Sequence, residues 1–459
     1  ITIDGSGFGA NEWIRVGFGT NVTYTWAQAS GAGTFSKTFN VDNQKRGNTQ
    51  IKATGSNTQQ AATGNFFIQP QIIEFTPTIG IVGTIVTVRG SGCYQPDTLK
   101  INFGNSSGER IVTINTTEFG SFTTTFTANT QVYGTTTATI TTNLTPEEPR
   151  TIEQLTKTFF IQQAWVTFTP NSGIVGTLVT VAGNGFAGNE GIVVSFGTNQ
   201  TITTTNAALN GSWTAIFPVD VQVYGGTAVT AKGTQTQVSI TDNFTIQPQI
   251  VSSLPTQGTV GTVITIVANG YGSETVKITY GLDENNANAG SMTTNASQYG
   301  SFTTYFTVNT QPYGTKSVFV RGQATTQLKT ASFKITPQAT ITPTQGIVGT
   351  SVAINGNGFV GPESLSVIFG MTTLGTVIAN SNGVINPNTF NIDAQPYGNT
   401  PGTVTGETSQ HPVNFPGIGF TILANLYSVQ PAQGTVGTII SVSGNGFERS
   451  STVNIKFGG

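Results

Sequence analysis

The residues that usually carry enzyme chemistry are scarce in this sequence. Its 459 residues include one histidine, His411, and one cysteine, Cys93. A histidine that acts as a general base or metal ligand needs partners, so we interpret His411, in the loop ETSQHPVNFPG, as a solvated side chain. Cys93 replaces the phenylalanine of a recurring G-x-G-F phrase, and we expect a small buried hydrophobe, with a thiol that links two chains as the alternative. A single cysteine excludes a disulfide within the chain.

Oxygen-bearing side chains gather at two places. The run from Asp283 to Asn286, with Asn288, has enough side-chain oxygens to bind Ca²⁺. It lacks the spaced D-x-D-x-D-G pattern of a calcium loop. We interpret it as a polar turn, and Glu147-Glu148 as part of a solvated loop. No phosphate-loop, C-x-x-C or H-E-x-x-H motif occurs. We therefore expect no catalytic, cofactor-binding or metal-binding residues, no cofactor, and a protein that is not an enzyme.

The charge balance and hydropathy exclude several classes of partner. Lysine and arginine total 18, aspartate and glutamate total 20, and the net charge is -2. No electrostatic argument therefore favours nucleic acid or an anionic membrane. No run approaches 18 apolar residues, so we expect no membrane-spanning segment. Hydrophobic residues reach 36%, which disfavours disorder, and the length favours several domains over one core.

One phrase recurs along the chain. It reads GIVGTLVTVAGNGF at 173–186, with close copies at 80–93, 258–271, 346–359 and 434–447, and the chain opens on ITIDGSGF. The copies follow one another at intervals of roughly 85 to 93 residues. Solenoid repeats are shorter, whereas one immunoglobulin-like sandwich takes about 100 residues. We predict that each unit is a domain with its own core.

Two strands in each unit are predicted from apolar residues that alternate with polar ones. One face of the first strand holds valine or isoleucine in every copy, as at Val86 and Val88. The second strand ends in an aromatic residue and glycine, with inward residues such as Leu99 and Ile101, and its last copy is VNIKFG at 453–458. A two-residue period with one apolar side indicates a half-buried strand.

The second half of each unit carries a further phrase, such as GSFTTTFTANTQVYGT from Gly120. Phe122 and Phe126 lie four residues apart and should share one strand face. We expect about seven strands in each unit and no helix. Four tyrosines that precede a glycine could form a tyrosine corner, in which the hydroxyl bonds to the backbone; Arg46 stands at this place in the first unit, and the tyrosines are Tyr133, Tyr224, Tyr313 and Tyr397.

The order P-x-x-G-x-V-G-T, apolar strand, G-x-G-F and a strand ending in F-G resembles the IPT/TIG group of immunoglobulin-like domains. The resemblance covers almost the whole chain, and its specific part is the first half of each unit. It implies an all-β fold of tandem immunoglobulin-like β-sandwiches in a large prokaryotic surface or secreted protein, and no catalytic residues. The prolines of the motif are Pro77, Pro170, Pro255, Pro343 and Pro431.

The repeats set the expected domain boundaries. Junctions such as Gln69-Pro70-Gln71 are short and contain proline, which limits bending, so we expect the sandwiches to be arranged as an elongated rod. We predict a repeat lacking its first strand at 1–70, complete repeats at 71–163, 164–248, 249–337 and 338–424, and the opening strands of a further repeat at 425–459.

Two interpretations of the incomplete end units remain open. In one, the chain is a window of a longer repetitive protein. In the other, the C-terminal piece of one molecule completes the N-terminal unit of the next by strand addition. The second interpretation predicts an open head-to-tail filament.

We expect a structural component of an extracellular fibre, sheath, surface layer or stalk, whose partners are other copies of the chain, head-to-tail or lateral. The alternative is an adhesin that binds glycan or a surface receptor through loops with exposed aromatics, such as Trp13, Trp26, Trp165 or Trp213. Trp213 stands at the place of Phe122, so we expect it in a core. N-glycosylation triplets occur about as often as chance predicts, at Asn21, Asn105, Asn115, Asn143, Asn199, Asn210, Asn243 and Asn295.

Overall fold

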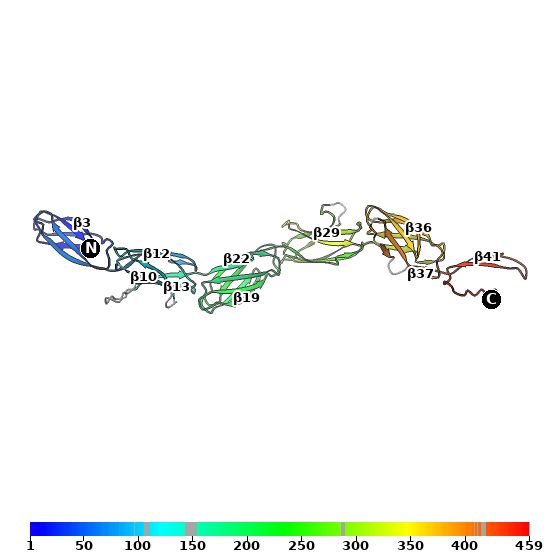
Figure 1. Cartoon of the computed structure of the whole chain (residues 1–459), viewed down its shortest axis with the longest axis horizontal. Coiled ribbons are helices and arrows are strands. Elements are labelled where there is room, and N and C mark those ends of the chain that lie inside the picture. Colours follow the sequence, from blue (N-terminus) through cyan, green and yellow to red (C-terminus); the bar gives the residue numbers. More distant parts are fainter. Residues whose placement is uncertain are drawn as a thin grey trace. The chain divides into compact units, whose positions relative to one another are not determined.

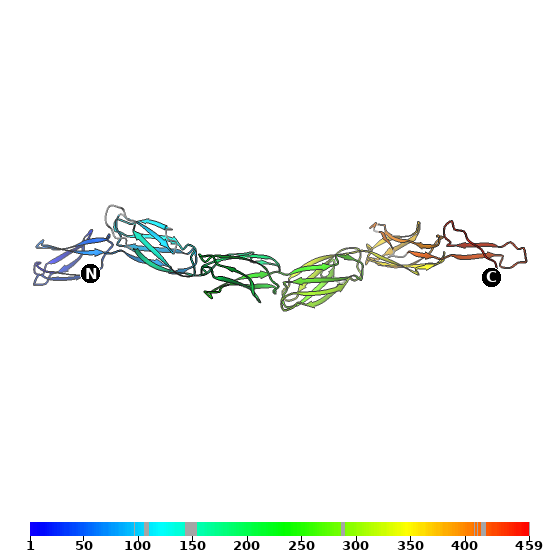
Figure 2. The same ribbon diagram turned by 90° about the horizontal axis from the view of Figure 1, so that it is seen from below.

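The computed structural model shows an all-β protein, as the sequence predicts. It describes residues 1–95, 97–104, 110–142, 154–285, 290–407, 409–410, 412–414 and 419–458, and every regular element within these ranges is a strand. Figures 1 and 2 accordingly draw arrows and no coiled ribbon. The chain divides into two compact units, one of Ile1–Asn171, Leu178–Pro218 and Ala228–Asn243, the other of Ser172–Thr177, Val219–Thr227 and Phe244–Gly459. The repeat boundaries stay predictions, and each repeat is named by its predicted residue range.

The first repeat, residues 1–70, forms two sheets. The strand order is β1-β4 in one sheet and β3-β2-β5-β6 in the other. The strands are β1 (Thr2–Gly5), β2 (Trp13–Phe18), β3 (Asn21–Gln28), β4 (Phe35–Thr38), β5 (Gly47–Gly55) and β6 (Ala61–Ile68).

The second repeat, residues 71–163, contains sheets of order β12-β9-β7 and β11-β10-β13-β14-β8. Figure 1 labels β10, β12 and β13 of this repeat. The pairing of β14 with the two-residue strand β8 is parallel, and the other pairings in this repeat are antiparallel. The strands are β7 (Gln71–Thr76), β8 (Ile79–Gly80), β9 (Ile85–Ser91), β10 (Thr98–Phe103), β11 (Arg110–Asn115), β12 (Phe122–Thr127), β13 (Gly134–Thr142) and β14 (Gln154–Ile161).

The third and fourth repeats, residues 164–248 and 249–337, repeat this topology. Their sheets run β15-β17-β20 with β16-β22-β21-β18-β19, and β23-β25-β28 with β24-β30-β29-β26-β27. The strands of the third are β15 (Ala164–Thr169), β16 (Ser172–Gly173), β17 (Leu178–Asn184), β18 (Gly191–Phe196), β19 (Asn199–Asn206), β20 (Trp213–Pro218), β21 (Gly225–Gly233) and β22 (Ser239–Ile246). Those of the fourth are β23 (Gln249–Leu254), β24 (Gln257–Gly258), β25 (Val263–Asn269), β26 (Thr275–Gly281), β27 (Gly290–Asn295), β28 (Phe302–Thr307), β29 (Gly314–Gly322) and β30 (Leu328–Ile335).

The fifth repeat, residues 338–424, departs from the pattern because β35 and β36 pair and join two layers into one sheet of order β31-β33-β36-β35-β34-β38-β39. The second sheet is β32-β40-β37. The strands are β31 (Gln338–Thr342), β32 (Gln345–Gly346), β33 (Ser351–Asn357), β34 (Glu363–Phe369), β35 (Thr372–Ala379), β36 (Ile385–Asn391), β37 (Gly398–Thr400), β38 (Gly402–Gly406), β39 (Pro412–Asn414) and β40 (Phe420–Ile422).

The alternating apolar residues form the cores as predicted. Val86, Val88, Leu99 and Ile101 are buried, and Phe122 and Phe126 lie in the same cluster. The clusters of the first, second, fourth and fifth repeats each draw their buried residues from one repeat. Each fully buried aliphatic or phenylalanine side chain contributes about 1.5–3 kcal/mol, so several strands stabilise a repeat without a disulfide.

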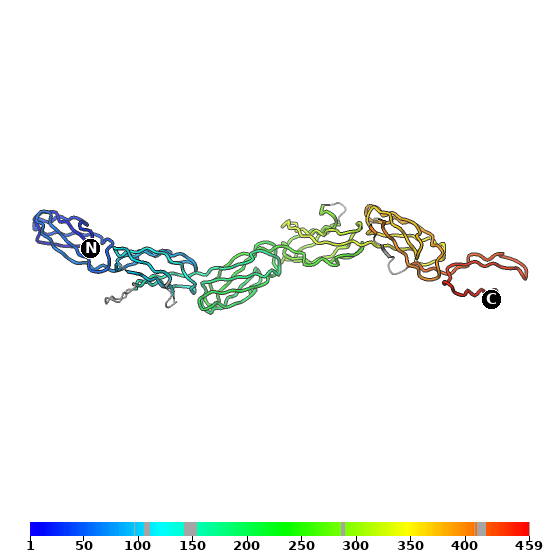
Figure 3. Tube along the Cα trace, in the orientation of Figure 1, coloured from blue at the N-terminus to red at the C-terminus, as the bar shows by residue number. Residues whose placement is uncertain are grey.

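The last copy of the motif corrects one prediction. The strand expected at 453–458 is not formed, and Val453, Ile455 and Phe457 are exposed. The described tail contains the hairpin of β41 (Asn425–Gln430) and β42 (Ser441–Asn445), which Figure 3 traces as two arms in red. A strand forms where neighbouring strands and an opposing layer bury its apolar face, and the hairpin supplies no such layer here.

Candidate functional site

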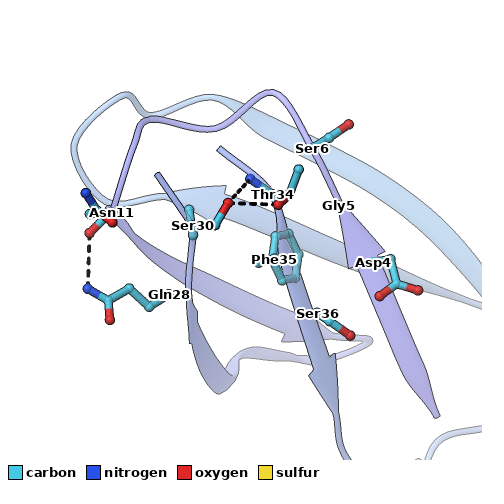
Figure 4. A pocket seen from close by; sticks show the side chains of 10 residues that line it. Asp4, Gly5, Ser6, Asn11, Gln28, Ser30, Thr34, Phe35 and Ser36 are labelled. Carbon is cyan, nitrogen blue, oxygen red and sulfur yellow. Dashed lines mark hydrogen bonds between the residues drawn. The ribbon is translucent and has the colours of Figure 1, made fainter. Parts of the chain in front are cut away.

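A concave region of about 780 Å³ lies in the first repeat, beside β1 and β4. Its lining combines mostly polar side chains, among them the Asp4 carboxylate, with the aromatic ring of Phe35 (Figure 4). The hydroxyls of Ser30 and Thr34 lie 2.8 Å apart and bond to each other, and Gln28 Nε2 donates to the carbonyl oxygen of Asn11 at 3.3 Å. The lining holds no histidine, cysteine or lysine.

A buried or half-buried glutamate recurs at the end of the sandwich in four repeats. Glu12 follows the G-x-G-F phrase of the first repeat and is buried. Its carboxylate accepts hydrogen bonds from the amides of Asn57 and Thr58, both at 3.0 Å, and from the Thr58 hydroxyl at 2.7 Å. The amide of Gly9 also donates to it. The carboxylate therefore ties the loop before β2 to the loop between β5 and β6.

The same arrangement occurs in three further repeats. Glu190 accepts from the amides of Gln235 and Thr236 at 3.1 and 3.0 Å, and from Ala187 at 2.6 Å. Glu274 accepts from the amides of Gly272, Ala324 and Thr325 and from the Thr325 hydroxyl. Glu363 accepts from the amides of Val360 and Ser409 and from the Ser409 hydroxyl. We call Glu12, Glu190, Glu274 and Glu363 the loop-tying glutamates.

Hydrogen bonds to the charged form explain the lowered pKa values of Glu12 and Glu274. The bond from the Thr58 amide, with those from the Thr58 hydroxyl, Gly9 and Asn57, lowers the pKa of Glu12 from 4.5 to about 2. The pKa of Glu274 is also lowered: burial raises it, but the bonds from the Thr325 hydroxyl and from the amides of Thr325, Ala324 and Gly272 outweigh burial. A carboxylate kept ionised and fully bonded holds loops together and is a poor general base.

A signal for these glutamates was present in the sequence. An acidic residue stands three or four positions after the aromatic of G-x-G-F in GFGANE, GFAGNE, GYGSE and GFVGPE. The partner loops read G-x-x-T or G-x-x-S, as in Gly55 to Thr58 and Gly406 to Ser409. Each motif alone resembles a solvated turn, and only their pairing across the fold identifies a buried acid.

A second recurring contact joins one repeat to the next. The amide of Tyr133 donates to the carbonyl oxygen of Phe186 at 3.1 Å, and the amide of Tyr224 donates to that of Tyr271 at 3.0 Å. The other pairs are Arg46 with Cys93, Tyr313 with Phe359 and Tyr397 with Phe447, at 2.9, 2.8 and 3.0 Å. Both residues of every pair belong to the same compact unit. We call these five hydrogen bonds the junction bonds.

Close packing accompanies the junction bonds. A Cβ on Gly211 would collide with the carbonyl oxygen of Phe186 and lie 3.1 Å from the Cα of Val132, in the preceding repeat. Gly211 also has a φ of 79°, which favours glycine. At the first junction the Arg46 guanidinium lies 4.9 Å from the ring centroid of Tyr94. The glycine of the G-S-F/W phrase thus lets the preceding loop approach.

Side chains at the short linkers add further contacts. Gln249 Nε2 donates to the carbonyl oxygen of Val175 at 3.1 Å, and Gln338 Nε2 donates to that of Val260 at 3.3 Å. Each glutamine begins one repeat and reaches back to the G-x-V-G-T turn of the repeat before it. These linkers are therefore bonded segments of the fold.

The tyrosines predicted as corners contribute these backbone amides. The predicted hydroxyl-to-backbone bond occurs at two other tyrosines, Tyr24, whose hydroxyl donates to the Asn40 carbonyl at 2.6 Å, and Tyr271, whose hydroxyl donates to the Val320 carbonyl at 3.3 Å. For Tyr133, Tyr224, Tyr313 and Tyr397 the corner stays a prediction. Arg46, which lacks a phenol, makes the same junction bond, so the contact depends on the backbone.

Cys93 is buried, with 2% of its surface exposed, as the sequence predicts. Burial, with the nearby Asp97 charge, raises the pKa of its thiol to about 12 against an opposing effect of Arg46. A buried, protonated thiol is a poor nucleophile. Nothing in this environment favours the alternative of a thiol that links two chains.

The oxygen-rich run contains a bonded turn in its described part. The Asn285 amide donates to Asp283 Oδ1 at 3.0 Å, and Glu284 forms a two-pronged ion pair with Arg321 at 2.6 and 2.7 Å. Arg321 also lowers the pKa of Glu284. The Glu284 carboxylate is thus engaged by a cation, in agreement with the polar turn that we predict. Asn286 and Asn288 lie outside the described residues.

Other candidates divide between core, surface and undescribed segments. Trp213 is 4% exposed, as predicted for a core residue, and its ring packs edge-on against Trp165 with centroids 5.6 Å apart. Trp13 and Trp26 are exposed. His411, Glu147, Glu148 and the glycosylation candidates Asn105 and Asn143 lie outside the described residues.

Within the described ranges, no group of three or more His, Cys, Asp or Glu side chains could hold a metal ion, and no helix could cross a membrane.

Comparison with known proteins finds no matching family model and no matching curated protein. Many solved structures resemble the chain, and three of them illustrate the low identity. A tetra-tandem repeat in the extending region of a large adhesion protein is 13% identical, with 73% of this chain and 95% of that chain covered and a TM-score of 0.23. Invasin, a bacterial integrin-binding protein, is 16% identical, with 79% and 82% covered and a TM-score of 0.22. The ICAM-5 D1–D4 ectodomain fragment is 12% identical, with 73% and 99% covered and a TM-score of 0.21.

The fold follows from the sheets themselves: the second, third and fourth repeats each contain a three-stranded and a five-stranded sheet, and in the second and fourth one core cluster draws buried residues from both sheets. The chain is an all-β protein of tandem immunoglobulin-like sandwiches.

Proposed function

We propose that this chain is a non-catalytic, load-bearing segment of an extracellular stalk, fibre, sheath or surface layer. The observation that carries the proposal is the junction bond, which recurs from the pair Arg46–Cys93 to the pair Tyr397–Phe447. A chain of independent binding modules needs no such contact, because flexible linkers serve it equally well. A spacer needs each module to resist bending against its neighbour.

Two further features support a mechanical role. The loop-tying glutamates close the ends of four sandwiches with hydrogen bonds to a charged acceptor, which are stronger than neutral ones. Only 8% of residues are charged, so neighbouring copies can pack side by side with little charge to desolvate. The partners in this proposal are other copies of the chain, and its IPT/TIG-like motif agrees with a place at the cell surface.

Imaging tests the proposal. Antibodies raised against the folded chain should label the surface or extracellular fibres of the organism that encodes it, in immunogold electron microscopy of intact cells. Labelling confined to the cytosol of sectioned cells would contradict the proposal. A strain that lacks the gene controls for cross-reaction.

A second candidate, an adhesin, is favoured by one observation. Trp13 and Trp26 are exposed in the first repeat. They lie on strands β2 and β3, not in the loops where we expected a binding residue. The two functions are compatible, because a spacer can carry a binding face on one of its repeats.

A further inference from the structure

The outer face of the β3-β2-β5-β6 sheet in the first repeat carries two tryptophans on adjacent strands. Trp13 is 54% exposed and Trp26 is 46% exposed. Trp26 pairs across the sheet with Arg15, and Trp13 pairs with Gln28. Because Trp13 and Arg15 are two residues apart, they project from the same face. The two tryptophans are diagonal neighbours, a relation in which Cβ atoms lie about 7–8 Å apart.

This face is specific to the first repeat. In each of the other repeats, a different cross-strand pair occupies the position equivalent to Arg15–Trp26. These pairs are Lys100–Thr113, Val193–Thr204, Lys277–Thr293 and Ser366–Thr376. The place of Trp13 holds Thr98, Gly191, Thr275 and Ser364. Small polar residues or glycine therefore suffice for the strand, and the two large exposed rings add nothing that the fold requires.

The charge of the face has one sign. Arg15 and Lys52 are exposed and project from neighbouring strands β2 and β5, where Lys52 pairs with Gly17 and Arg15 pairs with Thr54. The sequences of β2, β3, β5 and β6 contain no aspartate or glutamate. This cationic face belongs to a chain whose net charge is -2, so the positive charge is local.

Flat aromatic rings beside cations match one class of ligand. The apolar faces of sugar rings stack on indoles, which combine a large contact area with a polar edge. A guanidinium pairs two-pronged with carboxylate, and sulfate offers similar oxygens. We propose that Trp13, Trp26, Arg15 and Lys52 form a binding face for an acidic polysaccharide. This binding site stands apart from the stalk proposal, since a spacer without it would still be a spacer.

The test measures binding to the full chain by tryptophan fluorescence and isothermal titration calorimetry. The probes are polygalacturonate, which carries carboxylates, dextran sulfate, neutral dextran and poly(dT). We expect saturable binding of polygalacturonate or dextran sulfate that weakens as NaCl is raised, and no binding of dextran. Preference for one of the two acidic polymers identifies carboxylate or sulfate as the recognised group.

Substitutions assign the binding to this face. Trp13→Ala and Trp26→Ala should each weaken it about tenfold or more, and Arg15→Gln should weaken it and flatten its dependence on NaCl. Trp26→Phe, which keeps a ring, should weaken binding less and guards against a variant that fails to fold. Lys100→Gln, at the place of Arg15 in the second repeat, is the matched control and should leave binding unchanged.

Three results would overturn the proposal. They are no saturable binding of either acidic polymer, binding that the tryptophan variants leave intact, and binding of poly(dT) or dextran as tight as that of the acidic polymers. A stacking platform with cations also suits single-stranded nucleic acid, which makes the poly(dT) comparison decisive. None of these outcomes would change the conclusion on cell-surface location, which immunogold labelling tests separately.

Discussion

The backbone amide of Tyr224, in the third repeat, donates a 3.0 Å hydrogen bond to the carbonyl oxygen of Tyr271, in the fourth. The same pairing of a residue before glycine with the aromatic position of the next G-x-G-F phrase recurs at four other junctions. A contact made by the backbone persists when side chains change, as Arg46 and Cys93 illustrate. The junction bonds therefore recur along the chain together with the sandwiches that they connect.

Replacing a loop-tying glutamate should destabilise its repeat. Glu190 is fully buried and accepts three amide hydrogen bonds. Glu190→Gln keeps the shape but replaces one acceptor oxygen by an NH₂ group that faces amide donors. We expect a loss of about 1.5–3 kcal/mol in the free energy of unfolding, measured by urea denaturation. Glu118→Gln, at an exposed position, is the control, and equal losses in both variants would disprove the role of Glu190.

Acid should weaken the first repeat over a defined pH range. The folded pKa of Glu12 is about 2, below its ordinary value of 4.5, so the unfolded state binds the proton more tightly. The stabilisation is therefore complete above pH 4.5 and is lost as the pH falls from about 4.5 to about 2. The melting temperature of this repeat should fall across that range. The Glu12→Gln variant should have a lower melting temperature at neutral pH, and its melting temperature should depend less on pH. If the melting temperatures of the variant and the parent chain depend on pH in the same way, this account is wrong.

Two glycines with similar backbone conformation should respond differently to alanine. Gly211 and Gly176 both have positive φ, 79° and 88°, a conformation that costs an alanine about 1–2 kcal/mol. A Cβ on Gly176 meets nothing within 4 Å, whereas one on Gly211 meets the Phe186 carbonyl and the Val132 backbone. Gly211→Ala should therefore lose more unfolding free energy than Gly176→Ala, by roughly 1–3 kcal/mol. Equal losses would mean that Gly211 does not lie against the Phe186 carbonyl and the Val132 backbone as described.

The Cys93 thiol should be inert in the folded chain. It is buried, and burial raises its pKa to about 12, so the thiolate is rare at pH 8. Ellman's reagent should react with less than about a tenth of the thiol within an hour at pH 8, and completely after unfolding in guanidinium chloride. Prompt reaction of the native chain would instead favour a thiol available to link two molecules.

The strands were predictable because their signal is local. Alternation at Val86 and Val88, or at Leu99 and Ile101, reveals the buried face within a few residues, and the structure confirms it. The same alternation failed at Ile455 and Phe457, because burial also requires neighbouring strands that the tail hairpin does not provide.

The loop-tying glutamates and the junction bonds were less accessible to sequence reasoning. Glu12 and Thr58 are far apart in the chain and meet only once the sheets are assembled. The junction bonds join two backbone groups, which leave no side-chain signature. Alternation in WIRVGF places Trp13 outside the core, but only the register of β2 with β3 brings Trp26 beside Arg15.

Amide hydrogen exchange of the full chain tests the junction bonds most directly. The amides of Tyr133, Tyr224 and Tyr313 should exchange at least about a hundredfold more slowly than their intrinsic rates, as hydrogen-bonded amides in cooperative structure do. Tyr224→Pro, which removes the donor, should speed exchange in the loop around Gly300, while Tyr224→Ala, which keeps it, should not. Exchange of the three tyrosine amides at intrinsic rates would show that neighbouring repeats are not docked, and would contradict the account.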